Sequence, residues 1–215
     1  MLKKRLLEFF LTFGYIGKIK YCPGTLASIA TVPFTWLVVY AIMEQVMGGN
    51  LDFFTNLIYP ILDSWLDINL GYTFILFVAQ IIFLAFIIIL LIAGILVSSY
   101  YIKRYSDKQD PQEIVIDEVV GQMLTLFLCF PGFMLYPNIL FHYSRQYLGQ
   151  YHWIALFILP VILFRIFDIF KPWPISYIDQ NVKGGLGVML DDIVAAIFAS
   201  IAFYVILLPL HIYAR

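Results

Sequence analysis

Charged side chains are scarce in this chain. Only 13% of its 215 residues are Asp, Glu, Lys or Arg, whereas 62% are hydrophobic. An ordinary soluble domain has about a quarter of its residues charged, so the shortage argues against a water-soluble domain and indicates a protein surrounded by lipid. We expect helices, because the edge of an open sheet would leave unpaired backbone groups in hydrocarbon. The net charge of −1 says little about partners by itself, and no nucleic-acid partner is expected.

Several catalytic signatures are also absent. The two cysteines, Cys22 and Cys129, lack the spacing of a zinc site or a redox pair. Neither is followed by five residues and an arginine, which excludes a cysteine phosphatase on motif grounds. The sequence has no Walker-type P-loop and no D-x-D pair suited to an aspartyl-phosphate mechanism.

Five apolar stretches make up most of the sequence. The second of them carries no charge over more than the ~20 residues that a membrane span needs. The other four contain prolines or charges and are compatible with clean, tilted, broken or re-entrant spans. We expect an all-α polytopic membrane bundle of about five apolar helices, forming one domain over residues 1–215. The five stretches are residues 25–47, 72–97, 119–143, 153–170 and 192–212.

The basic residues are distributed unevenly across this arrangement. If all five stretches cross and the N-terminus is inside, eleven of the 13 Lys and Arg residues fall on the cytoplasmic side, and only Arg145 and Arg215 fall outside. Short cytoplasmic loops hold most Lys and Arg, so the bias supports the orientation. All three histidines fall outside, which argues against a phosphohistidine mechanism. The start of the chain, residues 1–13, is expected to be an uncleaved amphipathic segment on the membrane surface.

Three polar runs, residues 14–28, 98–121 and 165–192, fall on the cytoplasmic side. In the first run, Pro23 and Gly24 form a turn that begins a helix, with Thr25 or Ser28 available to cap it. The alternative is that the exposed amides and hydroxyls of this helix start receive a phosphate.

The second run contains DPQEIVIDEVVG at residues 110–121, with four carboxylates in nine residues. Asp110, Pro111 and Glu113 fit the first positions of a helix with a capping box. Capping leaves Asp117 and Glu118 unexplained, two turns into a helix that enters the bilayer, where an ionised carboxylate is costly unless it is paired or metal-bound. A bound cation would remove that cost.

In the third run, Arg165 and Asp168 are spaced to pair on one helical face, and prolines then end that helix. Asp191 and Asp192 fit caps of the last span. Each of these features, taken by itself, has an ordinary structural explanation. Such explanations do not account for the convergence of carboxylates and basic residues from three segments at one membrane face.

Carboxylates without histidine or cysteine suit Mg²⁺, which shares its coordination with waters and substrate phosphate. The metal candidates are Asp117, Glu118, Asp191 and Asp192. The candidates for binding phosphate are Arg165, Lys171, Lys183, Gly184, Gly185 and Thr25. Such a site suits phosphoester hydrolysis.

Four segments taken together resemble phosphatidylglycerophosphatase A: GYIGKIKYCPGTLAS at 14–28, EIVIDEVVGQ at 113–122, RIFDIFKPWPI at 165–175 and GGLGVMLDDIVAA at 184–196. The resemblance implies an all-helical, Mg²⁺-dependent enzyme of the bacterial inner membrane. It would hydrolyse phosphatidylglycerophosphate to phosphatidylglycerol and inorganic phosphate, with the lipid and the bilayer as its partners.

The resemblance also implies residue roles. The metal-binding and catalytic carboxylates would be Asp117, Glu118, Asp168, Asp191 and Asp192, with Arg165 and Lys171 contacting phosphate. The sequence departs from the family pattern at Ala27 and Ala196, where glycine is expected, and at Lys20, where proline is expected.

The main alternative to a lipid phosphatase is a small transporter whose buried carboxylates relay protons or bind cations. A phosphatidyl transferase is disfavoured because its D-G-x-x-A-R run is absent.

Overall fold

The computed structural model describes residues 2–47, 70–105, 111–135 and 152–213, and every regular element in these ranges is helical. The all-α prediction is therefore confirmed. The elements are α1 (Leu2–Leu11), the short 3-10 helix η1 (Ile16–Lys18), α2 (Pro23–Met47), α4 (Leu70–Tyr105), α5 (Ile116–Leu135), α7 (His152–Phe170), α8 (Ile175–Asn181) and α9 (Gly184–Tyr213).

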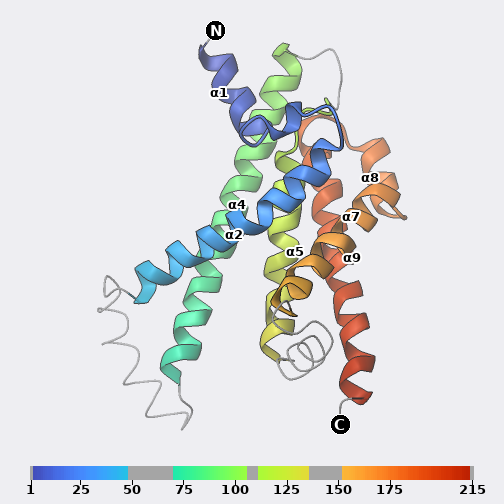
Figure 1. Cartoon of the computed structure of the whole chain (residues 1–215). Helices are drawn as coiled ribbons and strands as arrows, with labels where there is room; N and C mark the ends of the chain where they lie inside the picture. Colours follow the sequence, from blue (N-terminus) through green and yellow to red (C-terminus); the bar gives the residue numbers. More distant parts are fainter. Residues whose placement is uncertain (1, 48–69, 106–110, 136–151, 214–215) are drawn as a thin grey trace.

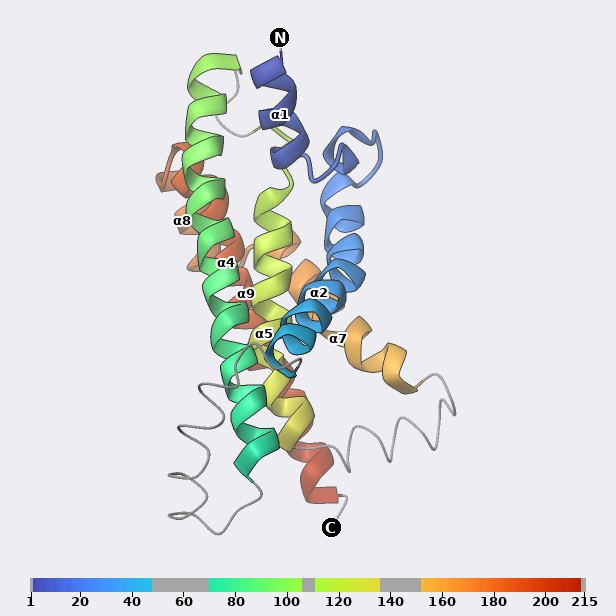
Figure 2. The same cartoon turned by 90° about the vertical axis from the view of Figure 1, so that its left-hand side faces the viewer.

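Three long helices, α4, α5 and α9, run alongside one another, while α2 and α7 cross them obliquely (Figures 1 and 2). The helices α1 and α8 lie at the end of the bundle where α5 and α9 begin, and the C-terminal end of α9 lies at the opposite end. The polar runs predicted to meet at one membrane face therefore do gather at one end of the bundle.

Three helices in the described part of the chain are long and apolar enough to cross a membrane: Pro23–Gln45, Leu76–Tyr105 and Gly184–Ile206. The described parts of the other two expected stretches also form helices, α5 and α7, while residues 136–143 of the stretch 119–143 lie outside the described residues. Prolines lie inside α2, α5 and α7, yet each helix continues through its proline. The interrupted stretches are thus oblique or buried helices rather than broken ones.

The outer faces of these helices are apolar and exposed. On α4, for example, Phe77, Ile81, Ile88, Ile92 and Leu96 are each more than half exposed or close to it. These residues recur at helical spacing on one face, and exposed apolar surface of this extent is stable when lipid covers it.

The helix α5 is the centre of the bundle. Its fully buried residues include Val119, Val120 and Met123, and its most extensive contact is with α9. A glycine makes this contact close, because a Cβ at Gly121 would lie 3.1 Å from the Asp192 carbonyl oxygen and 2.7 Å from the ring of Phe164.

Two predicted helix starts are wrong. The helix α9 begins at Gly184 rather than near residue 192, so Asp191 and Asp192 lie inside it and cap nothing. The helix α5 begins at Ile116, so Pro111 and Glu113 precede it; Asp110 lies outside the described residues. The segment before α5 bonds elsewhere: Val115 N–H donates to the Leu11 carbonyl at 2.9 Å, and Tyr101 O–H donates to Glu113 at 3.0 Å.

Two glycines at the α4–α9 contact give a test of this packing. A Cβ at Gly185 would lie 2.4 Å from the Ile95 carbonyl oxygen, which is backbone and cannot move aside. A Cβ at Gly94 would lie 2.7 Å from the Met189 methyl group, which is the end of a flexible side chain. We expect Gly185→Ala to destabilise the protein by about 1–3 kcal/mol and Gly94→Ala by clearly less, as measured by thermal unfolding in detergent. Equal losses would contradict the packing described here.

Candidate functional site

A pocket of about 520 Å³ opens at the end of the bundle where α5 and α9 begin. Its walls come from the N-terminal turns of α2, α5 and α9, the C-terminal turns of α7, and α8. Segments that are far apart in the sequence therefore contribute side chains to one cavity, and all five carboxylates predicted to be catalytic line it: Asp117, Glu118, Asp168, Asp191 and Asp192.

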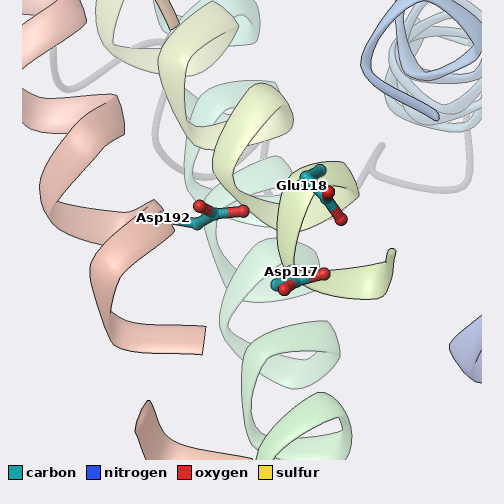
Figure 3. Close-up of side chains that lie close together, drawn as sticks. All are labelled: Asp117, Glu118 and Asp192. Atoms are coloured by element: carbon teal, nitrogen blue, oxygen red, sulfur yellow. The ribbon is translucent and has the colours of Figure 1, made fainter. Parts of the chain in front are cut away.

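Three of these carboxylates form a compact cluster. One oxygen each of Asp117, Glu118 and Asp192 lie within 4.8 Å of one another. Asp117 and Glu118 occupy the first turn of α5, and the side chain of Asp192 extends from α9 toward them (Figure 3). This separation allows one cation to contact all three carboxylates.

Several carboxylate oxygens of this cluster also lack hydrogen-bond donors in the described part of the chain. Asp192 is only 3% exposed. Among the described residues, Asp117 Oδ1, Glu118 Oε2 and Asp192 Oδ2 are buried and have no hydrogen-bond partner. Buried carboxylate oxygens without a donor are costly, so the site fits a bound cation.

The position of Asp117 and Glu118 has a partly structural explanation. Both lie in the first turn of α5, where the helix dipole favours negative charge. That interaction contributes about 0.3–1 kcal/mol, which is too small to offset the burial of three carboxylates that each keep an oxygen without a hydrogen-bond donor among the described residues. A ligand remains the better account of the cluster.

Arg165 reaches the cluster from α7. It pairs with Asp168 three residues later, as the sequence spacing predicted, and its Nη1 also lies 3.9 Å from Glu118 Oε1. Its Nε, which is buried, has no hydrogen-bond acceptor among the described residues. The guanidinium thus has donor capacity left for an anion in the pocket.

Lys171 links Asp179 on α8 to Asp191 on α9, with 2.6 Å between its amine and each carboxylate. Burial alone would lower the pKa of Lys171, but the hydrogen bonds with Asp179 and Asp191 raise it above its ordinary value. Lys171 therefore stays protonated. Asp191 is not one of the three carboxylates of the compact cluster, but its Oδ1 is likewise buried without a hydrogen-bond partner among the described residues, and its role as a metal ligand stays a prediction.

The predicted phosphate-binding residues divide into two groups. Thr25, Lys183 and Gly184 line the pocket, as do Arg165 and Lys171. Gly185 is not among the lining residues described; it packs its backbone against α4 instead. Ser28 does not cap α2 either, because its hydroxyl donates to the Gly24 carbonyl at 3.0 Å.

Two of the charged residues that line the pocket, Asp179 and Lys20, were not predicted from the sequence. Asp179 was overlooked although it is the one charged residue between positions 172 and 182, and that isolation was the available signal. Lys20 was noted only as a departure from a family pattern, yet it lines the pocket. The contact of the segment before α2 with this cavity is long-range and leaves no local sequence signal.

Gly24 allows the start of α2 to approach the cluster. A Cβ at this position would lie 2.1 Å from Glu118 Oε1 and 3.2 Å from Arg165 Nη1. A side chain at this position would push Glu118 and Arg165 away from the backbone of α2, which the glycine lets them approach.

The model of one protein family, described as phosphatidylglycerophosphatase A, matches residues 9–207, which is nearly the whole chain. The chain belongs to the phosphatidylglycerophosphatase A family. All of the pocket residues fall inside the matched range, so the site described above is part of what the family model covers.

Curated relatives agree with the family. The chain is 36% identical to the phosphatidylglycerophosphatase A of Escherichia coli (strain K12) over 97 residues, which cover 45% of each protein. It is 52% identical to that of Haemophilus influenzae over 44 residues, 20% of this chain and 27% of the relative. A protein of Bacteroides thetaiotaomicron named as a candidate phosphatidylinositol-3-phosphatase is 33% identical over 93 residues, 43% of this chain and 46% of the relative. The aligned regions thus span less than half the length of these relatives. No solved structure matches the chain.

Gly24→Ala should weaken cation binding without unfolding the protein. The added methyl group displaces Glu118 and Arg165, both side chains that can move, so the cost falls on the geometry of the cluster. Changes beside metal ligands reduce affinity by about 10–100-fold, and we expect a loss near the lower end. Titration of the detergent-solubilised protein with Mn²⁺, followed by electron paramagnetic resonance, measures this. The neighbouring variant Leu26→Ala, at an exposed position on the same helix turn, is the control. Equal Mn²⁺ affinity in both variants would contradict the role of Gly24.

Proposed function

We propose that this protein is a Mg²⁺-dependent lipid phosphatase that hydrolyses phosphatidylglycerophosphate to phosphatidylglycerol and inorganic phosphate. The observation that carries the proposal is the cluster of Asp117, Glu118 and Asp192, whose buried oxygens lack donors, beside Arg165 in one pocket. Membership of the family supports phosphatidylglycerophosphate as the substrate.

The net charge of the pocket lining supports the binding of a divalent cation. Among the residues that the structure describes, six carboxylates and four cationic side chains line the pocket, a formal excess of two negative charges, which is the charge that one Mg²⁺ would balance. Asp117, Glu118 and Asp192 would hold the ion, since their hard oxygen atoms are the ligands that Mg²⁺ prefers. When bound, Mg²⁺ polarises a phosphoryl group and lowers the pKa of water.

The chain's own residues bind and orient the phosphomonoester. Arg165 donates to phosphate oxygens, and its pairing with Asp168 fixes the guanidinium in the pocket. Lys171, held between Asp179 and Asp191, supplies a second permanent positive charge. Gly24 and Thr25 at the start of α2 also line the pocket, and the backbone N–H groups at a helix N-terminus are further donors to an anion.

Lipid headgroups have access to such a site. The pocket lies at one end of a bundle whose outer faces are apolar, so a phosphate at the membrane surface can enter while the acyl chains remain in the bilayer. The names of the relatives describe two lipids of one chemical kind, in which a phosphodiester joins the lipid to a headgroup that carries a phosphomonoester. Phosphatidylglycerophosphate is favoured because the family and two relatives carry that name.

The alternative of a proton- or cation-coupled transporter has less support. Such a protein would place charges near the bilayer midplane on discontinuous helices. In the described part of the chain, α2, α5 and α7 continue through their prolines, and the clustered carboxylates lie at one end of the bundle.

Removal of the metal should abolish activity. We expect the purified protein to release phosphate from phosphatidylglycerophosphate with Mg²⁺ and to stop with EDTA, as measured by free-phosphate assay. Asp117→Asn and Asp192→Asn should each lower turnover by orders of magnitude, since each removes a charged ligand from the cluster. Glu44→Gln, an exposed carboxylate on α2, is the matched control. Release that persists in EDTA would refute the metal, and normal rates in both Asn variants would refute the site.

The pocket should face the cytoplasm of a bacterial inner membrane, and the two native cysteines test this. Cys22 is exposed and lines the pocket, whereas Cys129 is buried. A membrane-impermeant maleimide should label Cys22 in inverted membrane vesicles and leave it unlabelled in right-side-out vesicles. Cys22→Ala should abolish the labelling. Labelling confined to right-side-out vesicles would reverse the proposed orientation.

A further inference from the structure

In the described part of the chain, four cationic side chains line the pocket, and they differ in their partners. Arg165 and Lys171 are engaged by carboxylates, as described above. Lys20 and Lys183 form no ion pair with any carboxylate in the described part of the chain. The amine of Lys20 lies 5.8 Å from the ring centre of its neighbour Tyr21, a contact that leaves its hydrogen-bond donors available. Two positive charges of the pocket are thus uncommitted.

Both uncommitted lysines belong to the mouth of the pocket. Lys20 and Lys183 are exposed, whereas Asp192 of the carboxylate cluster is 3% exposed. Lys183 immediately precedes α9, and Lys20 lies between η1 and α2. They therefore approach the cavity from separate segments and at less depth than the carboxylates.

The segment that carries Lys20 is docked onto the residues that precede Asp117. A Cβ at Gly17 would lie 2.1 Å from the Glu113 carbonyl oxygen, so the backbones touch there. The hydrogen bond from Val115 N–H to the Leu11 carbonyl, at 2.9 Å, joins the same two segments a few residues away. These contacts fix the backbone near Lys20 relative to the start of α5, so Lys20 belongs to the structured wall of the site.

The proposed substrate has two anionic groups, and the pocket has two basic regions at different depths. The phosphomonoester is the group that is cleaved, so it belongs with the carboxylate cluster and Arg165. We infer that Lys20 and Lys183 form a second subsite, which binds the phosphodiester that joins the headgroup to diacylglycerol. Lysine suits this task, because its ammonium is a point charge that satisfies a singly charged diester without bidentate geometry. This inference rests on the proposed function and assigns Lys183 to the diester rather than to the monoester.

Product inhibition distinguishes the two phosphates. Phosphatidylglycerol carries the diester alone, and inorganic phosphate resembles the monoester alone. In mixed micelles with phosphatidylglycerophosphate as substrate, we expect phosphatidylglycerol to inhibit the wild-type protein competitively. Lys20→Gln and Lys183→Gln should each weaken that inhibition and raise KM by on the order of tenfold, the loss expected for one hydrogen bond to a charged group. Inhibition by inorganic phosphate should change by less than about twofold, a factor small beside that loss.

Lys103→Gln is the matched control, because Lys103 is an exposed lysine near the end of α4 and does not line the pocket. A similar loss of phosphatidylglycerol inhibition in Lys103→Gln would attribute the effect to general surface charge and overturn the inference. Weakened inhibition by inorganic phosphate in the Lys20 and Lys183 variants would assign these lysines to the monoester, which also overturns it. So would unchanged inhibition by phosphatidylglycerol, or its absence in the wild type. A wild-type protein that releases no phosphate would instead refute the proposed function itself.

Discussion

The close contact between α5 and α9 is the constraint on which the rest of the structure depends. It brings the first turn of α5 against the third turn of α9, so that carboxylates from separate helices meet within 4.8 Å. Gly121 permits this approach one turn from Glu118, where any larger residue would meet Phe164 and the backbone of α9. The apolar core below the cluster stabilises that contact, and the stabilisation offsets the repulsion of the acidic side chains above it.

Sequence reasoning succeeded where the decisive geometry is local. The pairing of Arg165 with Asp168 follows from helix periodicity alone, and the end of α7 before Pro172 follows from the loss of a backbone donor. Unexplained carboxylates in an apolar chain need a partner, which singled out Asp117 and Glu118, and the convergence of the polar runs added Asp168, Asp191 and Asp192. All five line one pocket, and their roles stay predictions. The resemblance to the family pointed to the same residues.

Prediction from the sequence failed where contact with a distant segment determines where a helix begins or which residues pair. The residues before Asp117 look like a capping box, but their backbone bonds to the end of α1, so α5 begins later than predicted. Asp191 and Asp192 look like caps, but α9 starts at Gly184, whose φ of +76 suits glycine and sets the beginning of that helix. Nothing near Lys171 in the sequence indicates that it links Asp179 to Asp191. These contacts depend on tertiary packing that a single sequence does not display.

The distribution of the cluster over the chain has a consequence for biosynthesis. Asp117 and Glu118 begin a helix in the middle of the sequence, whereas Asp192 belongs to the last described helix. During translation the first two carboxylates therefore enter the membrane region well before their partner exists. The acidic pocket is completed only when α9 has been made and has packed against α5, so insertion of that helix is the step that brings the three clustered carboxylates together.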